Sequence, residues 1–169
     1  KKSIFVTHQT GDADYEVVKK KYNEKGFSAN VMPFLADMPE RYRIASLVIC
    51  RSGATTLAEI TAAGRASFLI PFPYAANNHQ EHNARVIEAA DAGEIILDKD
   101  ISGERIAQSI KRAMDEPETL KRMEDNSYRL GSRDAVEKVK RICLELMGDV
   151  VRVMENNNKT KEKNVLLCF

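Results

Sequence analysis

The chain has 169 residues, 43% hydrophobic and 30% charged, which is the balance of a globular protein large enough for one sizeable core. Its 26 basic and 25 acidic residues leave a formal net charge of +1, and this near-neutrality argues against a nucleic-acid partner bound through its phosphates. The sequence has no run of about 18 apolar residues, so we expect no transmembrane helix.

Strand-like and helix-like segments alternate along the chain. The strand-like segments are uniformly apolar, which is typical of a parallel sheet covered by helices on both faces, so we predict a Rossmann-like α/β fold. The predicted strands span residues 4–7, 28–32, 47–50, 67–70 and 94–97. The predicted helices span residues 12–24, 38–45, 55–63, 78–90, 102–115, 117–130 and 134–147.

The last three helices are expected to finish the core, because each has apolar residues at helical spacing. The final helix carries Val136, Val139, Ile142, Cys143 and Leu146 on one face. Beyond Gly148 the periodicity is lost, so we predict one domain over residues 1–147 and a disordered or non-domain tail over residues 148–169.

The stretch from Ile49 to Gly64 carries the strongest functional pattern. The pattern predicts the end of a strand, a turn of small residues and then a helix. The helix starts with Gly, Ala and two Thr, which leave its first backbone N–H groups accessible. Such a helix start favours an anion, because its unpaired donors coincide with the positive end of the helix dipole. Glu59 follows one turn later and could accept hydrogen bonds from ribose hydroxyls, or it could complete a capping box with Thr56.

A second polar cluster occupies residues 77–83, Asn-Asn-His-Gln-Glu-His-Asn. Amide side chains of this kind bind sugar hydroxyls, so the two patterns together indicate a nucleotide-sugar site. His79 and His82 also have a spacing that suits a metal, but the chain offers no third ligand at a suitable spacing, and we predict no metal. Arg51 could meet either a phosphate or a neighbouring carboxylate.

The cysteines indicate the compartment. The chain has three cysteines, an odd number, and they are widely spaced at Cys50, Cys143 and Cys168. This pattern matches neither a zinc site nor a disulfide framework. Since no signal peptide is visible either, we expect a reducing, cytoplasmic location.

Several motifs, in this order along residues 2–147, resemble the C-terminal domain of the MurG-type glycosyltransferases of family 28. They are His8-Gln9-Thr10-Gly11, Cys50-Arg51-Ser52-Gly53-Ala54, Glu59-Ile60-Thr61-Ala62-Ala63-Gly64, Ile70-Pro71-Phe72-Pro73, and His79-Gln80 with Asn83. The resemblance implies one half of a GT-B fold, in which two Rossmann-like domains face each other across a cleft. It also implies an inverting transfer of N-acetylglucosamine from UDP-N-acetylglucosamine to undecaprenyl-pyrophosphoryl-MurNAc-pentapeptide, in peptidoglycan synthesis at the cytoplasmic face of the membrane.

The resemblance also implies which residues bind the donor. Leu35 would meet uracil through its backbone, with Met38 packed nearby, and Gln80 and Asn83 would hold the sugar together with His79. The residues expected to face the ribose and diphosphate are Ser52, Gly53, Ala54, Thr56 and Glu59. Asp12-Ala13-Asp14 is similar to the metal motif of other glycosyltransferases, but acids at a helix start favour the helix dipole instead.

The chain departs from the family at its start. It begins at Lys1 without a methionine. The family's first strand and its phosphate-binding Gly-Gly-Ser loop would precede that residue. We therefore expect a donor-binding domain that is truncated at its N-terminal edge. The resemblance places the acceptor site and the catalytic base in the N-terminal domain, so we assign no catalytic residue or cofactor to this chain and expect it to be inactive alone. The alternatives are another UDP-sugar enzyme of GT-B architecture, such as a UDP-N-acetylglucosamine 2-epimerase, or the non-catalytic nucleotide-binding half of a split enzyme.

Overall fold

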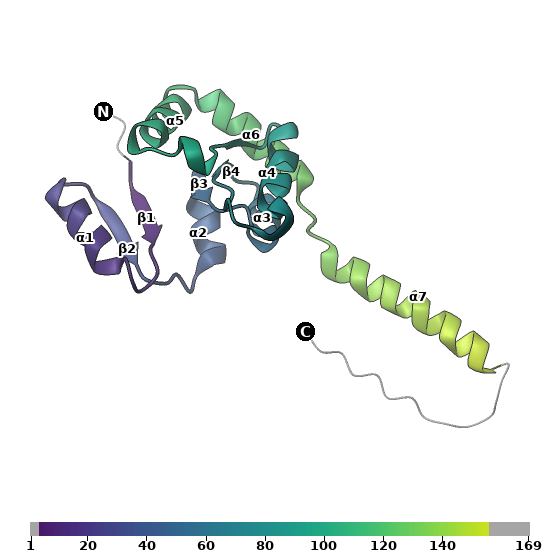
Figure 1. The fold of residues 1–169 in the computed structure, drawn as a ribbon. Helices are drawn as coiled ribbons and strands as arrows, with labels where there is room; N and C mark the ends of the chain where they lie inside the picture. The colour runs from purple at the N-terminus through teal and green to yellow at the C-terminus, as the bar shows by residue number, and fades with distance from the viewer. Residues whose placement is uncertain (1–3, 156–169) are drawn as a thin grey trace.

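The computed structural model describes residues 4–155, and for residues 148–155 it describes the backbone alone (Figure 1). Strands and helices alternate as far as β5, and helices follow. In chain order the elements are β1 (Val6–Gln9), α1 (Tyr15–Glu24), β2 (Ala29–Met32), α2 (Met38–Ile44), β3 (Leu47–Cys50), α3 (Ala54–Ala63), β4 (Ala66–Leu69), α4 (His79–Ala89), β5 (Gly93–Ile95), α5 (Gly103–Asp115), α6 (Pro117–Leu130) and α7 (Ala135–Glu155), with short 3-10 turns at Ala76–Asn78 and Asp98–Asp100.

All strand pairs are parallel, so the predicted α/β class is confirmed. The strands nevertheless divide between two sheets, a two-stranded sheet β1-β2 and a three-stranded sheet β3-β4-β5. The registers pair Val6 with Ala29, Leu47 with Ala66, and Ser67 with Gly93. In Figure 1 the unit formed by β1, α1 and β2 stands beside the body that contains the larger sheet, and the chain passes between them through the segment that leads into α2.

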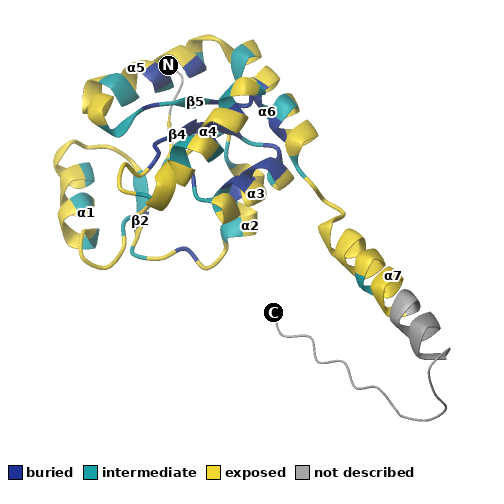
Figure 2. Cartoon of the chain, turned by 45° about the vertical axis from the view of Figure 1, so that its right-hand side comes forward, coloured by how far each residue is buried: buried dark blue, intermediate teal, exposed yellow. Residues whose placement is uncertain are grey.

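The core lies on the two faces of the three-stranded sheet, whose central strand β4 is buried throughout (Figure 2). Side chains alternate across a strand, so neighbouring residues of β4 enter different clusters. Leu69 packs with Leu57 of α3 and Ile87 of α4 on one face. Phe68 packs with Ile96 and with Ala113 of α5 on the other. The larger sheet is thus covered by helices on both sides, as the apolar strands predicted.

The C-terminal end of α3 is closed by a glycine and an arginine. Gly64 adopts the left-handed conformation, with φ of 64°, which a residue without a Cβ tolerates best. The Arg133 guanidinium donates to the carbonyls of Thr61 and Ala62, 3.1 Å away in each case, and lies 3.4 Å from the ring centroid of Tyr128. These contacts satisfy carbonyls that the end of a helix leaves unpaired, and they tie α3 to the segment after α6.

Helix α7 corrects two predictions. It continues to Glu155, so a helix end at Met147 is wrong, and the predicted tail is helical over residues 148–155. The helix passes through Gly148, since a glycine inside a helix costs only about 1 kcal/mol relative to alanine. The helix also extends away from the body instead of finishing the core, and Val136 is 78% exposed and Leu146 61% exposed (Figure 1). Residues 156–169 lie outside the described part of the chain.

Two boundaries also differ near the start. Strand β1 begins at Val6, whereas the sequence predicted a strand from Ile4, and Ile4 and Phe5 are exposed. Helix α1 begins at Tyr15 instead of Asp12, and no side chain caps it. An apolar run marks where a strand can form, but pairing with a neighbour decides where it does, and β1 follows the length of β2.

The close approach of Gly131 to α3 gives a test of this packing. A Cβ built on Gly131 would lie 2.3 Å from the carbonyl oxygen of Thr61, so the alanine variant must push α3 and α6 apart. We expect Gly131→Ala to lower the free energy of unfolding by about 1–3 kcal/mol, measured by urea denaturation followed by circular dichroism. Gly103→Ala is the matched control, since a Cβ there meets nothing within 4 Å. Equal stability of the two variants would contradict the packing described for α3 and α6.

Candidate functional site

The turn between β3 and α3 leaves the start of α3 open. Gly53 occupies the position before the helix in an extended conformation, with φ of −65° and ψ of 145°. No side chain caps this helix and no acidic residue lies in its first turn, while Ala54 and Thr55 are exposed. The first backbone N–H groups of α3 are therefore accessible, at the positive end of the helix dipole.

Helix α4 fixes this turn in place. Ser52 is fully buried, and its hydroxyl donates to the backbone carbonyl of Gln80 over 2.7 Å. The Asn83 amide donates to the backbone carbonyl of Ser52 over 3.2 Å. The side-chain oxygen of Gln80 accepts from the backbone N–H of Phe72 over 3.0 Å, which fixes the loop after β4. The structure thus brings three of the residues predicted from sequence into one hydrogen-bonded cluster at the carboxyl ends of β3 and β4.

Each polar side chain of α4 at this cluster keeps one unused group. Among the described residues, the Gln80 amide nitrogen and the Asn83 side-chain oxygen have no hydrogen-bond partner. His79 Nδ1 lies 2.8 Å from the Ala76 carbonyl, and a carbonyl can only accept, so Nδ1 carries the proton and Nε2 is left as an acceptor. A donor and two acceptors therefore remain near the start of α4.

Tyr42 connects Glu59 to helix α2. The Tyr42 hydroxyl donates to Glu59 Oε2 over 3.2 Å, from a side chain that is 7% exposed, whereas Glu59 itself is exposed. Burial first, and then the neighbouring Glu59 carboxylate, raise the pKa of Tyr42 above its ordinary value, so the phenol stays a donor. The capping-box interpretation of Glu59 is wrong, because α3 begins at Ala54 and Glu59 therefore lies in its second turn.

The loop before α2 is fixed by Gln9. Leu35 is buried, and its backbone N–H donates to Gln9 Oε1 over 2.9 Å. The backbone carbonyl of Leu35 is therefore the group left for a ligand. Met38 is the first residue of α2 and is half-buried. Among the described residues no hydrogen bond joins this loop to the turn after β3, and the two are linked through Tyr42 and Glu59.

Arg51 has a carboxylate partner, which is one of the two partners that the sequence left open. Its guanidinium donates to the carbonyls of Ile70 and Pro71 and lies 2.8 Å from Asp98 Oδ1. It also lies over the ring of Phe72, 5.6 Å from the centroid. Arg51 thus holds the loops after β4 and β5 beside the turn.

Sequence reasoning missed the partners of these residues. Gln9 belongs to one of the motifs noted above, but its bond to Leu35 spans 26 positions. Asp98 lies 47 positions from Arg51, and Tyr42 lies 17 positions from Glu59. In a single sequence no local spacing marks contacts of this length, because they depend on how the elements pack.

The groups that resembled metal ligands gain no third ligand in the described part of the chain. Within residues 4–147, no set of three or more His, Cys, Asp or Glu side chains is arranged to hold a metal ion. No described helix is long and apolar enough to cross a membrane.

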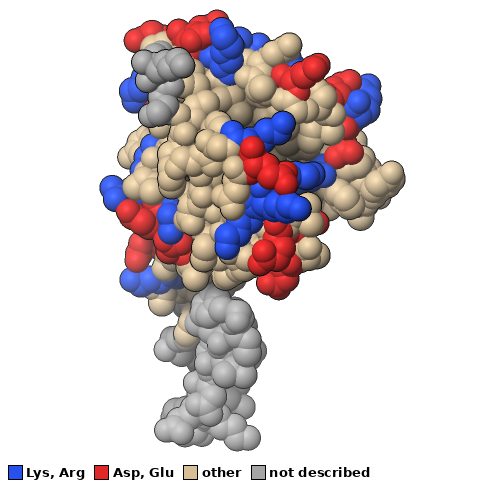
Figure 3. Space-filling view, turned by 90° about the vertical axis from the view of Figure 1, so that its left-hand side faces the viewer, with Lys and Arg blue, Asp and Glu red and all other residues tan. Residues whose placement is uncertain are grey.

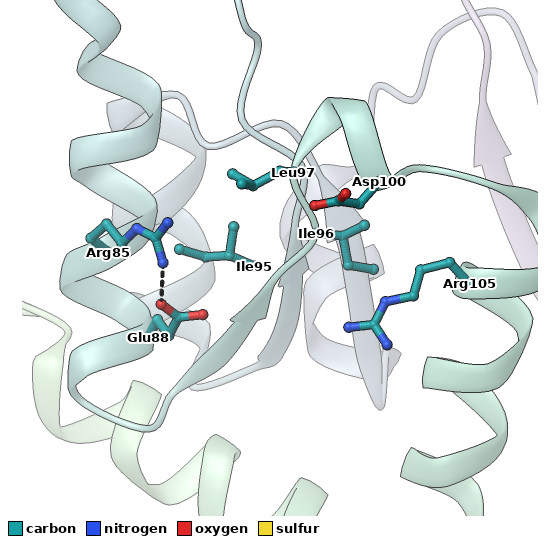
Figure 4. A pocket seen from close by; sticks show the side chains of 7 residues that line it. All are labelled: Arg85, Glu88, Ile95, Ile96, Leu97, Asp100 and Arg105. Atoms are coloured by element: carbon teal, nitrogen blue, oxygen red, sulfur yellow. Dashed lines mark hydrogen bonds and ion pairs between the residues drawn. The ribbon is translucent and has the colours of Figure 1, made fainter.

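A hollow of about 290 Å³ lies away from this cluster, between α4 and α5 at the end of β5 (Figure 4). Arg85 and Glu88 on α4 line one side and Arg105 on α5 lines the other. Both arginines have acidic partners, since Arg85 pairs with Glu88 and Arg105 pairs with Glu94. The hollow therefore has no cation left over for an anionic ligand, and we assign it no function.

The surface in Figure 3, on the side of α1, shows acidic and basic side chains interspersed. No extended basic patch appears on that face, in keeping with a net charge of +1. A surface of this kind does not provide the row of cations with which proteins neutralise a nucleic-acid backbone.

The parallel α/β fold, with an uncapped helix start and polar side chains at the carboxyl ends of its strands, defines a Rossmann-like domain. The sequence profile of the glycosyltransferase family 28 C-terminal domain matches residues 1–139, and the chain belongs to this family.

Two similar curated proteins are both named UDP-N-acetylglucosamine--N-acetylmuramyl-(pentapeptide) pyrophosphoryl-undecaprenol N-acetylglucosamine transferase. The one from Thermodesulfovibrio yellowstonii is 48% identical over 147 residues, which cover 87% of this chain and 40% of the relative. The one from Myxococcus xanthus is 44% identical over 147 residues, covering 87% of this chain and 38% of the relative. The chain thus spans about two fifths of the length of these relatives.

Solved structures with a similar fold include two glycosyltransferases. MurG of Acinetobacter baumannii has a TM-score of 0.78 and 26% identity, with 86% of this chain and 44% of that chain covered. The spinosyn forosaminyltransferase SpnP has a TM-score of 0.52 and 14% identity, with 84% of this chain and 44% of that chain covered, and it supports the fold alone. The first agrees with the prediction of one half of a GT-B fold.

Cys50 is the last residue of β3, directly before the turn of the candidate site. The reactivity of its thiol tests how well this end of the strand is shielded from solvent. Burial raises the pKa of its thiol to about 12, so at pH 8 the reactive thiolate is scarce. We expect iodoacetamide to modify Cys50 far more slowly than Cys143, as read by peptide mass spectrometry, and the difference to vanish in 6 M urea.

The raised pKa of Cys50 also sets the sign of a pH effect on stability. The folded state holds the proton more tightly than the unfolded state does, so this contribution is complete below about pH 8.5 and is lost as the pH rises towards 12. Rapid alkylation of Cys50 in the folded chain at pH 8 would contradict the burial of its thiol.

Proposed function

We propose that this chain is the UDP-N-acetylglucosamine-binding half of a glycosyltransferase that acts on undecaprenyl-pyrophosphoryl-MurNAc-pentapeptide. The observation that carries the proposal is the cluster of Ser52, Gln80 and Asn83, which holds an uncapped helix start beside unused amide groups. Membership of family 28 and the name of the two relatives support the same substrate pair. With this acceptor, the whole enzyme would work at the cytoplasmic face of the membrane, and the chain needs no nucleic-acid partner.

The start of α3 suits the diphosphate. Ala54 and Thr55 are exposed residues at the first two positions of the helix, and Thr56 adds a hydroxyl in the same turn. As the bond to the sugar breaks, negative charge grows on the departing UDP, and fixed N–H donors stabilise that charge without having to reorganise. Small residues at Gly53 and Ala54 let the phosphates approach the backbone closely.

Glu59 and the loop before α2 suit the uridine. Tyr42 occupies one carboxylate oxygen of Glu59 and leaves Oε1 for the ribose hydroxyls. Because Gln9 already occupies the N–H of Leu35, the proposed backbone contact to uracil goes through the Leu35 carbonyl, which accepts from the imide N–H. Met38 would then cover one edge of the base from the start of α2.

The unused groups of α4 suit the sugar. The Gln80 amide nitrogen can donate to a sugar hydroxyl, and the Asn83 side-chain oxygen and His79 Nε2 can accept from others. Their second polar atoms are fixed to the protein, so the three side chains are already oriented before the ligand arrives, and less conformational entropy is lost on binding. The sugar would thus lie between α4 and the turn after β3.

The role of Glu59 can be tested by Glu59→Gln. A hydrogen bond to a charged group contributes about 1.5–3 kcal/mol, so we expect the Kd for UDP to rise about ten- to a hundredfold, measured by NMR titration of the labelled chain. Stability should change little, because the glutamine oxygen can still accept from Tyr42 and the residue is exposed. Glu104→Gln, in the first turn of α5, is the control and should leave the affinity unchanged.

The same titration separates the competing readings of Glu59. Shifts gathered at Leu35, at residues 53–59 and at residues 80–83 would support the proposed site. An unchanged affinity in Glu59→Gln would mean that this carboxylate serves only its bond to Tyr42. Tighter binding of ADP than of UDP would contradict a uridine site.

Transfer should require the rest of the enzyme. Orienting donor and acceptor together can lower the activation barrier by about 7–11 kcal/mol, and a general base can raise the rate roughly 10²–10⁴-fold. The proposed site provides neither effect for an acceptor. We therefore expect no detectable transfer to a lipid-linked acceptor analogue by this chain alone. Addition of the N-terminal part of the Thermodesulfovibrio yellowstonii relative should restore turnover. Turnover by the chain alone would place a base within it, with His79 and His82 the first residues to replace.

A further inference from the structure

The Glu59 carboxylate is exposed, but a buried side chain holds it in place. Among the described residues, its only hydrogen-bond partner is the Tyr42 hydroxyl, 3.2 Å from Oε2. Tyr42 is 7% exposed and belongs to α2, 17 positions earlier in the chain. An exposed glutamate otherwise exchanges between several rotamers, and this bond favours the ones that reach Tyr42. The position of the carboxylate is therefore set by α2 as well as by its own helix α3.

Tyr42 is a donor with little freedom of its own. Its side chain is buried where α2 lies beside α3 (Figure 2). Burial first, and then the Glu59 carboxylate, hold the pKa of Tyr42 above its ordinary value, so the phenol keeps the proton that it donates. The hydroxyl thus acts as a fixed donor, and the more mobile carboxylate takes the orientation that this bond requires.

A carboxylate in a fixed orientation can recognise two neighbouring hydroxyls. Its two oxygens together accept about four hydrogen bonds, and Tyr42 uses one of those at Oε2. Oε1 and the remaining lone pair of Oε2 are left for a ligand, and the 2′- and 3′-hydroxyls of a ribose lie side by side on one ring. Because the carboxylate is oriented before the ligand arrives, less conformational entropy is lost on binding than for a free glutamate.

Helix α2 also leads from the base to the ribose in the proposed site. The loop before it carries Leu35, the proposed partner of uracil, and the helix starts at Met38. Tyr42 lies one turn further along and reaches Glu59. One short helix therefore positions both the loop that would contact the base and the carboxylate that would contact the sugar hydroxyls.

We propose that Tyr42 is a positioning residue, which holds Glu59 so that the domain selects ribonucleotides over nucleotides that lack the ribose hydroxyls. This inference rests on the proposed function, since it assumes a uridine nucleotide at this site. The competing role is purely structural, because a buried tyrosine hydroxyl usually needs a partner and Glu59 supplies one. A structural bond affects stability alone, whereas a positioning bond changes the discrimination between ligands.

The test compares UDP with 2′,3′-dideoxy-UDP in NMR titrations of the labelled chain. The ratio of the two Kd values measures discrimination, and we expect the unmodified chain to bind UDP about tenfold or more tightly than the dideoxy ligand. Tyr42→Phe should raise the Kd for UDP about three- to tenfold, the effect of one hydrogen bond. It should leave the Kd for 2′,3′-dideoxy-UDP unchanged, so the ratio falls by the same factor.

Tyr22→Phe is the matched control. It also removes one tyrosine hydroxyl with a partner 3.2 Å away, here His8 Nδ1, but it does so on α1. Thermal melting of both variants should show similar small losses of stability. Only Tyr42→Phe should change the ratio of the two Kd values.

A double-mutant cycle shows whether Tyr42 acts through Glu59. Glu59→Ala should raise the Kd for UDP about tenfold or more and abolish discrimination. Adding Tyr42→Phe to that variant should then change the Kd by about twofold at most, because residues that act through one contact are not additive. Equal effects of Tyr42→Phe with and without Glu59 would overturn the proposal.

The outcomes separate this inference from the proposed function. If Glu59→Ala abolishes discrimination while Tyr42→Phe leaves the ratio unchanged, the uridine site stands and the bond from Tyr42 is only structural. If the chain does not bind UDP, or if Glu59→Ala leaves the ratio unchanged, the inference is wrong together with the proposed role of Glu59. A ratio that falls in Tyr42→Phe and not in Tyr22→Phe, with the predicted non-additivity, supports the positioning role.

Discussion

The bond from the buried Ser52 hydroxyl to the Gln80 carbonyl is the contact on which the candidate site depends. It joins the turn that starts α3 to the first turn of α4, and both helix starts then meet at the carboxyl edge of the sheet. The bond is short and is made by a fully buried residue, and loss of this contact would cost about 0.5–1.5 kcal/mol of stability. The residues offered to the ligand, Gln80 and Asn83, are the same residues that hold the turn. Binding and folding therefore share one network.

The sequence predicted what depends on local pattern. The alternation of apolar and amphipathic segments predicted parallel strands covered by helices, and the small residues at Ser52 to Ala54 predicted an accessible helix start. It could not predict contacts between distant elements, such as Arg51 with Asp98 or Tyr42 with Glu59. These form because α2, α3 and the loops after β4 and β5 are packed side by side, and packing is a property of the whole core.

Two errors arose because burial was inferred from apolarity alone. The apolar face of α7 predicted a core helix, and the apolar run of β3 predicted a strand covered on every side. Hydrophobic periodicity shows that a face can be buried, but it does not identify what buries it. In this chain both faces remain exposed, at Val136 and at Ile49, so their partners need not belong to residues 4–155.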